Sequence, residues 1–492
     1  MTRKVELGAY TATIGIECHV QLATNTKLFA SVSNDAREAA PNTLVSHICF
    51  GLPGALPVLN EAAVHLAAKA AFALGTEPQR FSKFDRKHYF YPDLPLGYQI
   101  TQFDEPIILG GSMDIVVEGQ RKTIGITRAH LEADAGKSVH PAGTDYSLVD
   151  LNRAGTPLLE IVSEPDMHSS AEAKAYTREL WLAMKYAGVS DCNLYYGNMR
   201  FDVNVSVSKT TTMGTRTETK NINSFRAVEK VVDYEIQRQI SVLESGELVL
   251  QETRGWDDAK QATFSQRSKE DAHDYRYFPD PDLPPVTLTD AFVAQIRSEM
   301  PVGPAEWRQR LVVLGLDDAS VETLLDAEVE DEQVSYLPLI ETVQADAVFA
   351  RALANWFINI EIPHRRNAAT IIGDLKDGER VELYHALHTL VGANKLSSTN
   401  AKQLVSDILA MDAVPENIEL YATQKGYIQV SDQGAVAKIV AQVLADNVKA
   451  AEDVRNGEMK AIGFLVGQVM KLSQGKANPQ MAQELIRKQL GL

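Results

Sequence analysis

The chain of 492 residues lacks the features that mark several large classes of protein. It has three cysteines, at positions 18, 49 and 192, which are too few and too far apart for a disulfide framework. No stretch approaches the roughly 18 consecutive apolar residues of a membrane-spanning helix, and no signal-type apolar run follows the N-terminus. These absences favour a cytoplasmic protein with free thiols and no membrane contact.

Short motifs of several common enzyme classes are also missing. There is no G-x-x-x-x-G-K-[ST] phosphate loop and no dinucleotide-binding glycine fingerprint. There is no G-x-S-x-G nucleophile elbow and no H-E-x-x-H zinc motif. Covalent catalysis by an activated serine or cysteine is therefore not expected, and any use of ATP requires another phosphate-binding arrangement.

The charge of the chain is strongly negative but unevenly distributed. The net charge is −17, from 48 basic and 65 acidic residues, and an acidic chain repels the phosphates of nucleic acids. Residues 414–492, however, contain nine basic and eight acidic residues, a local charge of +1. The acidic average thus leaves room for a neutral or basic surface near the C-terminus.

The composition changes once along the chain. Apolar residues make up 45% and charged residues 23%, as in folded proteins, and at roughly 150 residues per domain the length suggests about three domains. The sequence is rich in glycine, proline and short apolar alternations up to about residue 290, and helical in pattern afterwards. We predict an α+β chain with an antiparallel-sheet cradle over 1–290, a helical domain over 291–412 and a small α-helical tail domain over 413–492.

A proline-rich run lies where the composition changes. Residues 277–285 contain four prolines, and proline fixes an extended backbone that cannot continue a helix. The run is either a stiff linker or a segment beside the active site, and the sequence leaves both interpretations open.

Helix signals are few in the first half. Helices are predicted over 62–74, 171–187 and 225–243, with polar residues before them and glycines at or near their ends. In the second half, residues 347–357 are one clear helical segment among many.

Two alternating runs predict strands. Residues 199–207 alternate apolar and polar side chains, which places Asp202 and Asn204 on the polar face of a strand. Residues 215–221 alternate as well and follow a glycine-containing connection, so we predict an antiparallel pair. One face would pack on helices, and the other would be an open face that is either solvent-exposed or a substrate platform.

Acidic and histidine side chains enter apolar surroundings in three separate segments. Glu17 and His19 share one face of a predicted strand, and His130 and Glu132 alternate in the same way. Glu160 lies in an apolar run, where a lone carboxylate is costly to bury without a cation or a hydrogen-bond network. Carboxylates beside an imidazole suit a divalent cation, although Glu17 and His19 alone could equally form an ion pair at a sheet edge.

A basic and aromatic run follows at residues 83–100. It begins with several bases, including Arg86 and Lys87, and continues with aromatic residues and prolines. The bases could hold phosphate oxygens. The aromatic side chains could stack on a nucleobase or simply form a small hydrophobic core.

Several long runs together resemble one known family, the B subunits of the glutamine-dependent aspartyl/glutamyl-tRNA amidotransferases. They are residues 14–22, 84–93, 147–166, 220–226, 251–256, 274–279 and 463–471. Their number, length and order make the resemblance highly specific over nearly all of 14–285.

The resemblance implies a reaction and a set of partners. Such subunits act on Glu-tRNA(Gln) or Asp-tRNA(Asn): ATP phosphorylates the side-chain carboxylate with the help of Mg²⁺, and ammonia then displaces the phosphate. Ammonia comes from glutamine hydrolysis in the amidase (A) subunit of the complex, and a small third (C) subunit clamps the two. The flexible helical tail contacts tRNA.

The resemblance also implies roles for individual residues. His19, Glu132 and Glu160 are expected to ligate Mg²⁺, with Glu17 nearby for a second cation. Lys87 is expected to stabilise phosphoryl charge.

Weaker expectations concern residues near these. Asp202 and Glu218 are possible catalytic carboxylates, and Arg86 and Asn204, with Lys87, possible ATP-binding residues. For Asp202, Asn204 and Glu218, a satisfied polar strand pair is an equally good interpretation.

The sequence departs from the family pattern in three places. Where many relatives carry paired zinc-binding cysteines, only Cys49 remains, so no structural zinc is expected. Ala133 and the Tyr195-Tyr196 pair stand where relatives often have acids, which leaves fewer ligands for a second metal. A tRNA-binding scaffold that does not catalyse the reaction is the alternative, but the retention of Glu17, His19, Glu132 and Glu160 favours a catalytic role.

Overall fold

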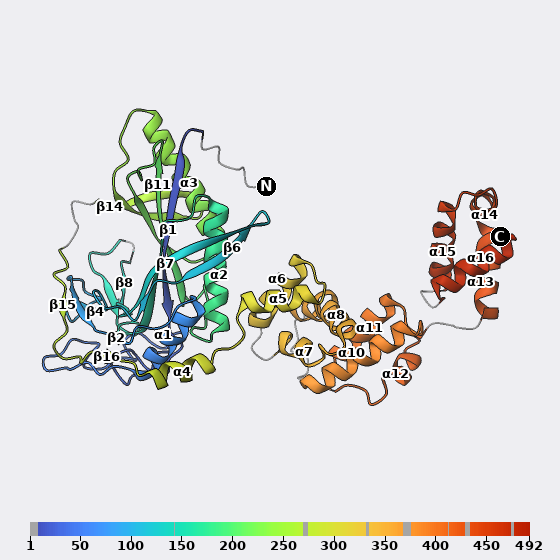
Figure 1. The fold of residues 1–492 in the computed structure, drawn as a ribbon, viewed down its shortest axis with the longest axis horizontal. Helices are drawn as coiled ribbons and strands as arrows, with labels where there is room; N and C mark the ends of the chain where they lie inside the picture. Colours follow the sequence, from blue (N-terminus) through green and yellow to red (C-terminus); the bar gives the residue numbers. More distant parts are fainter. Residues whose placement is uncertain are drawn as a thin grey trace. The chain divides into compact units, whose positions relative to one another are not determined.

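The computed structural model describes residues 8–141, 143–268, 274–330, 334–367, 375–411, 413–428, 433–473 and 477–492. The chain forms two compact units, Met1–Pro304 and Ala305–Leu492 (Figure 1). The first unit contains all strands of the described residues and the second is helical, which confirms the predicted α+β class. The three-domain division stays a prediction.

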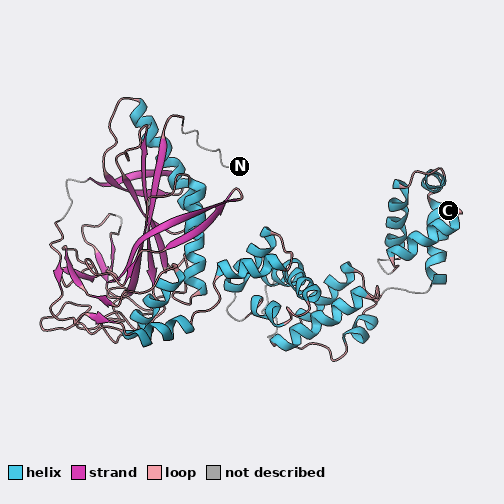
Figure 2. Ribbon diagram, viewed as in Figure 1, coloured by secondary structure: helices cyan, strands magenta, loops and turns pink. Residues whose placement is uncertain are grey.

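A large sheet of twelve strands organises the first unit (Figure 2). Its main path runs β14-β13-β12-β11-β1-β10-β7-β4-β3-β15, and β5 and β6 both pair with β7. The strands are β1 (Thr11–Gln21), β3 (Asp85–His88), β4 (Tyr98–Thr101), β5 (Ile108–Leu109), β6 (Ser112–Val117), β7 (Gln120–Ala133), β10 (Pro157–Ser163), β11 (Met199–Ser208), β12 (Thr217–Ile222), β13 (Glu252–Asp257), β14 (Ala262–Ser268) and β15 (Phe278–Pro279). Two small sheets pair β2 (Phe81–Ser82) with β16 (Val286–Thr287) and β8 (Lys137–Val139) with β9 (Leu148–Asp150).

The sheet is mixed rather than purely antiparallel. The predicted pair of β11 and β12 is antiparallel, as expected. The next pair, β12 and β13, is parallel. A parallel pair needs a long crossover connection, and here helix α3 (Phe225–Glu244) lies between the two strands in the sequence.

Helices cover one face of this sheet. α1 (Glu61–Ala73), α2 (Ser170–Tyr186) and α3 match the three predicted helices closely. The side chains of Asn60, Ser169 and Ser224 accept backbone N–H bonds at their N-termini, as N-cap residues do. Alternate apolar residues of β1 and β11 are fully buried in a core that these helices share, so the opposite face receives the polar side chains.

The polar face of β11 differs from the expected open surface. Asp202 is 3% exposed and Asn204 is 7% exposed. Buried polar groups need partners, and Asp202 accepts the backbone N–H of Asn221 at 2.8 Å and is paired with Lys220. Charged neighbours on adjacent strands therefore cover this face in part.

The proline-rich run belongs to the sheet. β15 pairs with β3, where Phe278 lies opposite Arg86 and Pro279 opposite Asp85. Proline is tolerated there because β15 is the edge strand of the sheet. The interpretation of this run as a linker is therefore wrong, and the run lies against the strand that carries Lys87. It leads to α4 (Asp290–Ser298), which packs on α1.

The second unit is built from short helices. They are α5 (Pro304–Val313), α6 (Asp318–Glu330), α7 (Leu337–Thr342), α8 (Ala347–Trp356), α9 (Ile362–Asn367), α10 (Asp377–Gly392), α11 (Ser398–Leu409), α12 (Ile418–Gln424), α13 (Gln433–Asp446), α14 (Val448–Arg455), α15 (Lys460–Leu472) and α16 (Pro479–Leu490), with a π-helical turn η2 (Phe357–Glu361) between α8 and α9. None of the helices described is both long enough and apolar enough to cross a lipid bilayer.

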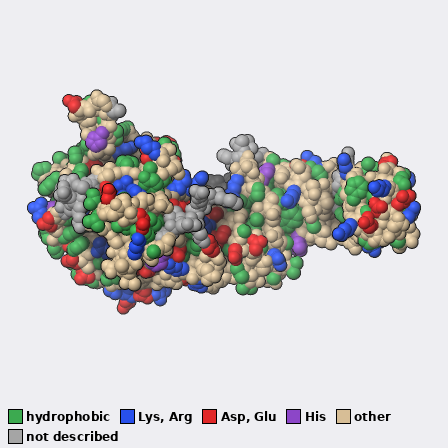
Figure 3. All heavy atoms as spheres, turned by 90° about the horizontal axis from the view of Figure 1, so that it is seen from above, with side chains coloured by type: hydrophobic (Ala, Val, Ile, Leu, Met, Phe, Trp, Pro, Cys, Tyr) green, Lys and Arg blue, Asp and Glu red, His purple; other side chains and the backbone are tan. Residues whose placement is uncertain are grey.

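The last four helices have a hydrophobic core of their own. Val440, Val454, Leu465 and Ile486, from α13 to α16, are fully buried in it. Acidic and basic side chains are interspersed on these helices, at the right of Figure 3. This agrees with the nearly neutral charge of residues 414–492.

A buried ion pair organises the helices before them. Glu361, at the end of η2, is fully buried, and its carboxylate lies 3.0 Å from the guanidinium of the equally buried Arg380 on α10. The carboxylate also accepts hydrogen bonds from Tyr384 at 2.6 Å and Arg365 at 2.9 Å. These contacts join the wide turn of η2 to α10.

Removing this charge should destabilise the second unit. In Glu361→Gln, the buried Arg380 keeps only the exposed Asp377, 3.3 Å from its Nη1 atom, as a counter-charge, and breaking a buried pair in this way typically costs about 3–5 kcal/mol. We expect a loss of that order in urea unfolding of the full chain, with faster hydrogen exchange in α8 and α10. In the control Glu330→Gln, the lost pair with Arg366 is half exposed, and the loss should stay below about 1 kcal/mol. Equal losses in the two variants would contradict a structural role for the buried pair.

Candidate metal centre on the sheet

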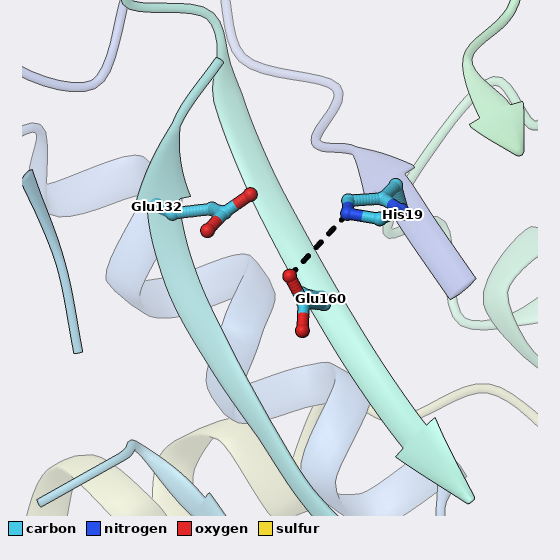
Figure 4. A group of neighbouring side chains, drawn as sticks. All are labelled: His19, Glu132 and Glu160. Atoms are coloured by element: carbon cyan, nitrogen blue, oxygen red, sulfur yellow. Dashed lines mark ion pairs between the residues drawn. The ribbon is translucent and has the colours of Figure 1, made fainter. Parts of the chain in front are cut away.

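Three adjacent strands bring the first group of site residues together. In the register of the sheet, His19 on β1 lies opposite Glu160 on β10, and Glu160 lies opposite His130 on β7. Glu132, two residues further along β7, points to the same face because side chains alternate along a strand. Figure 4 shows His19, Glu132 and Glu160 converging from these three strands.

The distances within this group suit a small cation. The Nε2 atom of His19 lies 3.3 Å from Oε2 of Glu160. One donor atom from each of His19, Glu132 and Glu160 lies within 4.8 Å of the other two. An imidazole nitrogen and two carboxylates form a suitable donor set for a divalent metal. The predicted convergence is present, and the role of these residues as metal ligands stays a prediction.

A second acidic group lies next to the first. Glu17, Asp202 and Glu218, from β1, β11 and β12, each offer an oxygen within 4.8 Å of the others. Glu17, expected near a second cation, thus lies with the two predicted catalytic carboxylates. The amide nitrogen of Asn204 donates to Glu17 at 3.1 Å.

The electrostatics of the first group reflect burial and close opposite charges. Burial alone would lower the pKa of His19, but its hydrogen bond to Glu160 and the nearby acids raise it from 6.5 to about 9. Burial alone would raise the pKa of Glu160, but His19 and His130 hold it well below its ordinary value. In the second group, burial and then the charge of Glu160 raise the pKa of Glu17.

Lys87 and Arg86 have different surroundings although they are neighbours on β3. Lys87 is directed toward the first group: burial opposes its charge, yet Glu132 and Glu160 raise its pKa overall. Its Nζ atom lies 4.9 Å from the centre of the Tyr275 ring, a cation–π distance.

Arg86 is held by acids that follow β15. Its guanidinium lies 2.8 Å from Asp280 and 2.8 Å from Asp282, and 4.3 Å from the centre of the Tyr98 ring. These contacts fasten the proline-rich run to β3. The predicted ATP-binding role of Arg86 stays a prediction.

Two residues of the site received no role from the sequence. The Nε2 atom of His130 lies 3.6 Å from Glu132 and 3.9 Å from Glu160, and its buried Nδ1 has no hydrogen-bond partner among the described residues. Lys220 lies 3.2 Å from both Asp202 and Glu218. The sequence did contain a signal for both residues. His130 is two residues from Glu132 and Lys220 two residues from Glu218, which places each pair on one strand face.

A polar cleft adjoins the site at the Gln21 end of β1. Its volume is about 400 Å³, and its lining includes Arg37, Lys137 and Arg153. Asp134, just beyond β7, pairs with both Arg153 and Arg200 at this end of the sheet. Of the two tyrosines at the position where relatives often have acids, Tyr196 lines the cleft and Tyr195 is 87% exposed.

The cysteine in the expected zinc region contacts a lysine. The buried ammonium of Lys27 lies 3.4 Å from the sulfur of Cys49 and donates to the carbonyls of Ala154 at 2.7 Å and Leu151 at 3.3 Å. The expectation that the chain binds no structural zinc stays a prediction.

Comparison with known proteins gives a consistent picture. The family profile described as "GatB/GatE catalytic domain" matches residues 12–294, and the profile described as "GatB domain" matches residues 339–490. The chain is 44% identical over 492 residues to the B subunit of the aspartyl/glutamyl-tRNA(Asn/Gln) amidotransferase of Caldicellulosiruptor saccharolyticus, covering 98% of this chain and 99% of the relative. It is also 44% identical to the protein of the same name from Carboxydothermus hydrogenoformans, with the same coverage.

The raised pKa of His19 predicts a pH-dependent stability. A histidine whose pKa rises on folding, here from 6.5 to about 9, contributes stability that is complete below pH 6.5 and lost as the pH rises through 9. The quantity to follow is the free energy of unfolding of the wild type minus that of His19→Gln, measured with a metal chelator present. We expect this difference to fall by at most about 3 kcal/mol as the pH rises from 6.5 to 9. The check is urea unfolding at a series of pH values. The surface control His47→Gln should keep the wild-type slope, and a His19→Gln curve parallel to the wild type would contradict the buried pair.

Proposed function

The chain belongs to the GatB family, the B subunits of aspartyl/glutamyl-tRNA(Asn/Gln) amidotransferases, and from this premise we propose that it catalyses the ATP-dependent amidation of Glu-tRNA(Gln), Asp-tRNA(Asn) or both. The observation that carries the proposal is the convergence of His19, Glu132 and Glu160 from three strands on one sheet face. In this proposal the chain is the component of a carbon–nitrogen ligase at which the tRNA-linked carboxylate is activated.

The chemistry explains why a cation site is needed. A carboxylate is a poor electrophile, so a phosphoryl group from ATP first gives it a leaving group, which ammonia then displaces. His19, Glu132 and Glu160 would hold Mg²⁺, which when bound neutralises charge on the phosphoryl oxygens. The two carboxylates are ligands that Mg²⁺ prefers, and the His19 imidazole adds a nitrogen donor; all three are largely buried and come from distant segments.

Other residues would handle charge and protons. Lys87, whose ammonium interacts with Glu132 and Glu160, would stabilise negative charge on the phosphoryl group. Glu218 is more exposed than Asp202 and is thus better placed to accept the proton released as ammonia attacks. Arg86 and Asn204 are proposed to help hold ATP, Arg86 by keeping β3 and the proline-rich run together.

The partners follow from the reaction. Ammonia would be delivered by the amidase (A) subunit, with the small third (C) subunit holding the two together. The cleft of about 400 Å³ beside the sheet has three basic and three acidic residues in its lining. It is proposed to receive the end of a bound tRNA or a nucleotide, whose phosphates the basic residues would contact. The tail over 413–492, whose last four helices have a core of their own, is proposed to contact tRNA.

Loss of one proposed metal ligand should separate catalysis from tRNA binding. We expect Glu132→Gln, assembled with its partner subunits, to lose at least 100-fold of its amidation rate (order of magnitude for a lost charge-stabilising group) while keeping its tRNA affinity. The assay supplies each misacylated tRNA with ATP, Mg²⁺ and glutamine, and also reveals which tRNA is the substrate.

A matched control uses another acid. Glu105→Gln removes the same charge at an exposed position outside the site and should retain wild-type activity. If Glu132→Gln also retained it, the metal assignment would fail, and a role as a tRNA-binding scaffold would be favoured.

Deletion of the tail should affect binding instead. A chain that ends before residue 414 should bind tRNA more weakly, with a shallower dependence of affinity on salt, because fewer phosphate contacts release fewer counterions. Filter binding at several salt concentrations measures both quantities. Unchanged affinity and slope would remove the tail from the proposal.

A further inference from the structure

The second acidic group already contains a cation of the protein. We propose that Lys220 serves as a built-in cation of the Glu17–Asp202–Glu218 group, so that without nucleotide the chain binds one divalent cation rather than two. The inference deepens the proposed function and rests on it, because it assigns a stoichiometry to the metal centre and a role to a residue beside it.

The position of Lys220 supports this role. Its Nζ atom lies 3.2 Å from a carboxylate oxygen of Asp202 and 3.2 Å from one of Glu218. The side chain of Asp202 is 4% exposed and that of Glu218 is 20% exposed, whereas that of Lys220 is 40% exposed. The ammonium thus enters the group from the solvent side and bridges two largely buried acids.

Apart from Lys220, the second group consists of side chains that commonly ligate cations. Asn204 is more than nine-tenths buried, and its amide nitrogen donates to Glu17. Its carbonyl oxygen, also buried, has no hydrogen-bond partner among the residues described. Three carboxylates and an amide oxygen are ligands that hard divalent cations prefer. The buried Oδ1 atom of Asn204 is therefore available to ligate a metal ion beside the three acids.

In the first group, histidines rather than a lysine lie next to the acids. Its acids are paired with His19 and His130, and within the described part of the chain no Lys or Arg nitrogen lies within 4 Å of the Glu132 or Glu160 carboxylates. A neutral imidazole has a lone pair and can become a ligand, whereas an ammonium has none. A divalent ion can thus enter the first group with both imidazoles in place, His19 becoming a ligand as its proton leaves, but must displace the ammonium of Lys220 from the second.

Removal of the ammonium should open the second group. Without Lys220, three carboxylates would face one another with no cation between them, an arrangement that like-charge repulsion disfavours. A divalent ion would relieve this repulsion. The decisive quantity is therefore the number of ions bound by variants at position 220.

The test counts Mn²⁺ ions on the full-length chain without nucleotide, by titration calorimetry and by the electron paramagnetic resonance signal of free Mn²⁺. We expect about one tightly bound ion in the wild type and about two in Lys220→Met. Lys220→Arg keeps the positive charge and should remain at about one. Lys220→Gln serves as a second uncharged variant if Lys220→Met does not fold.

A background variant separates this inference from the proposed function. Glu132→Gln should remove the first ion, and Glu132→Gln combined with Lys220→Met should bind one ion at the second group. If the double variant bound none, or if the wild type already bound two, the inference would be overturned. If Glu132→Gln alone left Mn²⁺ binding unchanged, the first site of the proposed function would fail instead.

Discussion

Repulsion between carboxylates on one face of the sheet is the constraint on which the rest of the site depends. The register of β1, β10, β7, β11 and β12 places five acids on this face within two groups, each spanning less than 5 Å. The opposite face is filled by apolar side chains under α2 and α3, so these acids cannot turn into the core. Each group must therefore be balanced by cations, either from side chains or from ions.

The buried acids of this protein are balanced by cations in three ways. In the helical unit, Glu361 has Arg380 and Arg365 close to it, and the pair is complete within the protein. In the second group of the sheet, one ammonium serves three carboxylates. In the first group, two imidazoles are the nearest partners. The sites differ in how completely the protein neutralises its own acids, and incomplete neutralisation is what leaves room for an ion.

The sequence predicts the local parts of this arrangement well. Caps and glycines located α1, α2 and α3, and alternation placed Glu17 with His19 on one strand face and Asp202 with Asn204 on another. It could not show that the run at 277–285 pairs with β3, because that contact joins segments about 190 residues apart, 278 being opposite 86. Alternation places Glu218 and Lys220 on one strand face, but it could not show how β12 is aligned with β11, because the register shifts between Phe201 and Val203.

The place of Lys220 on β12 explains why one lysine reaches two acids. At the regular part of the pair, Asn204 lies opposite Glu218 on one side and Gly15 on the other, so Glu218 approaches Glu17 diagonally across β11. Beyond the irregularity, Phe201 lies opposite Ile222, so β12 carries one more residue over this stretch than β11 does. A bulge of this kind re-aims side chains, and the side chain of Lys220 lies between Asp202 and Glu218. Glu218 and Lys220 are two residues apart on one face of β12, and the backbone N–H of Asn221, in the irregular stretch, donates to Asp202 at 2.8 Å. Alternation along β12 and the irregular stretch beside Asp202 together place a single ammonium between these two acids.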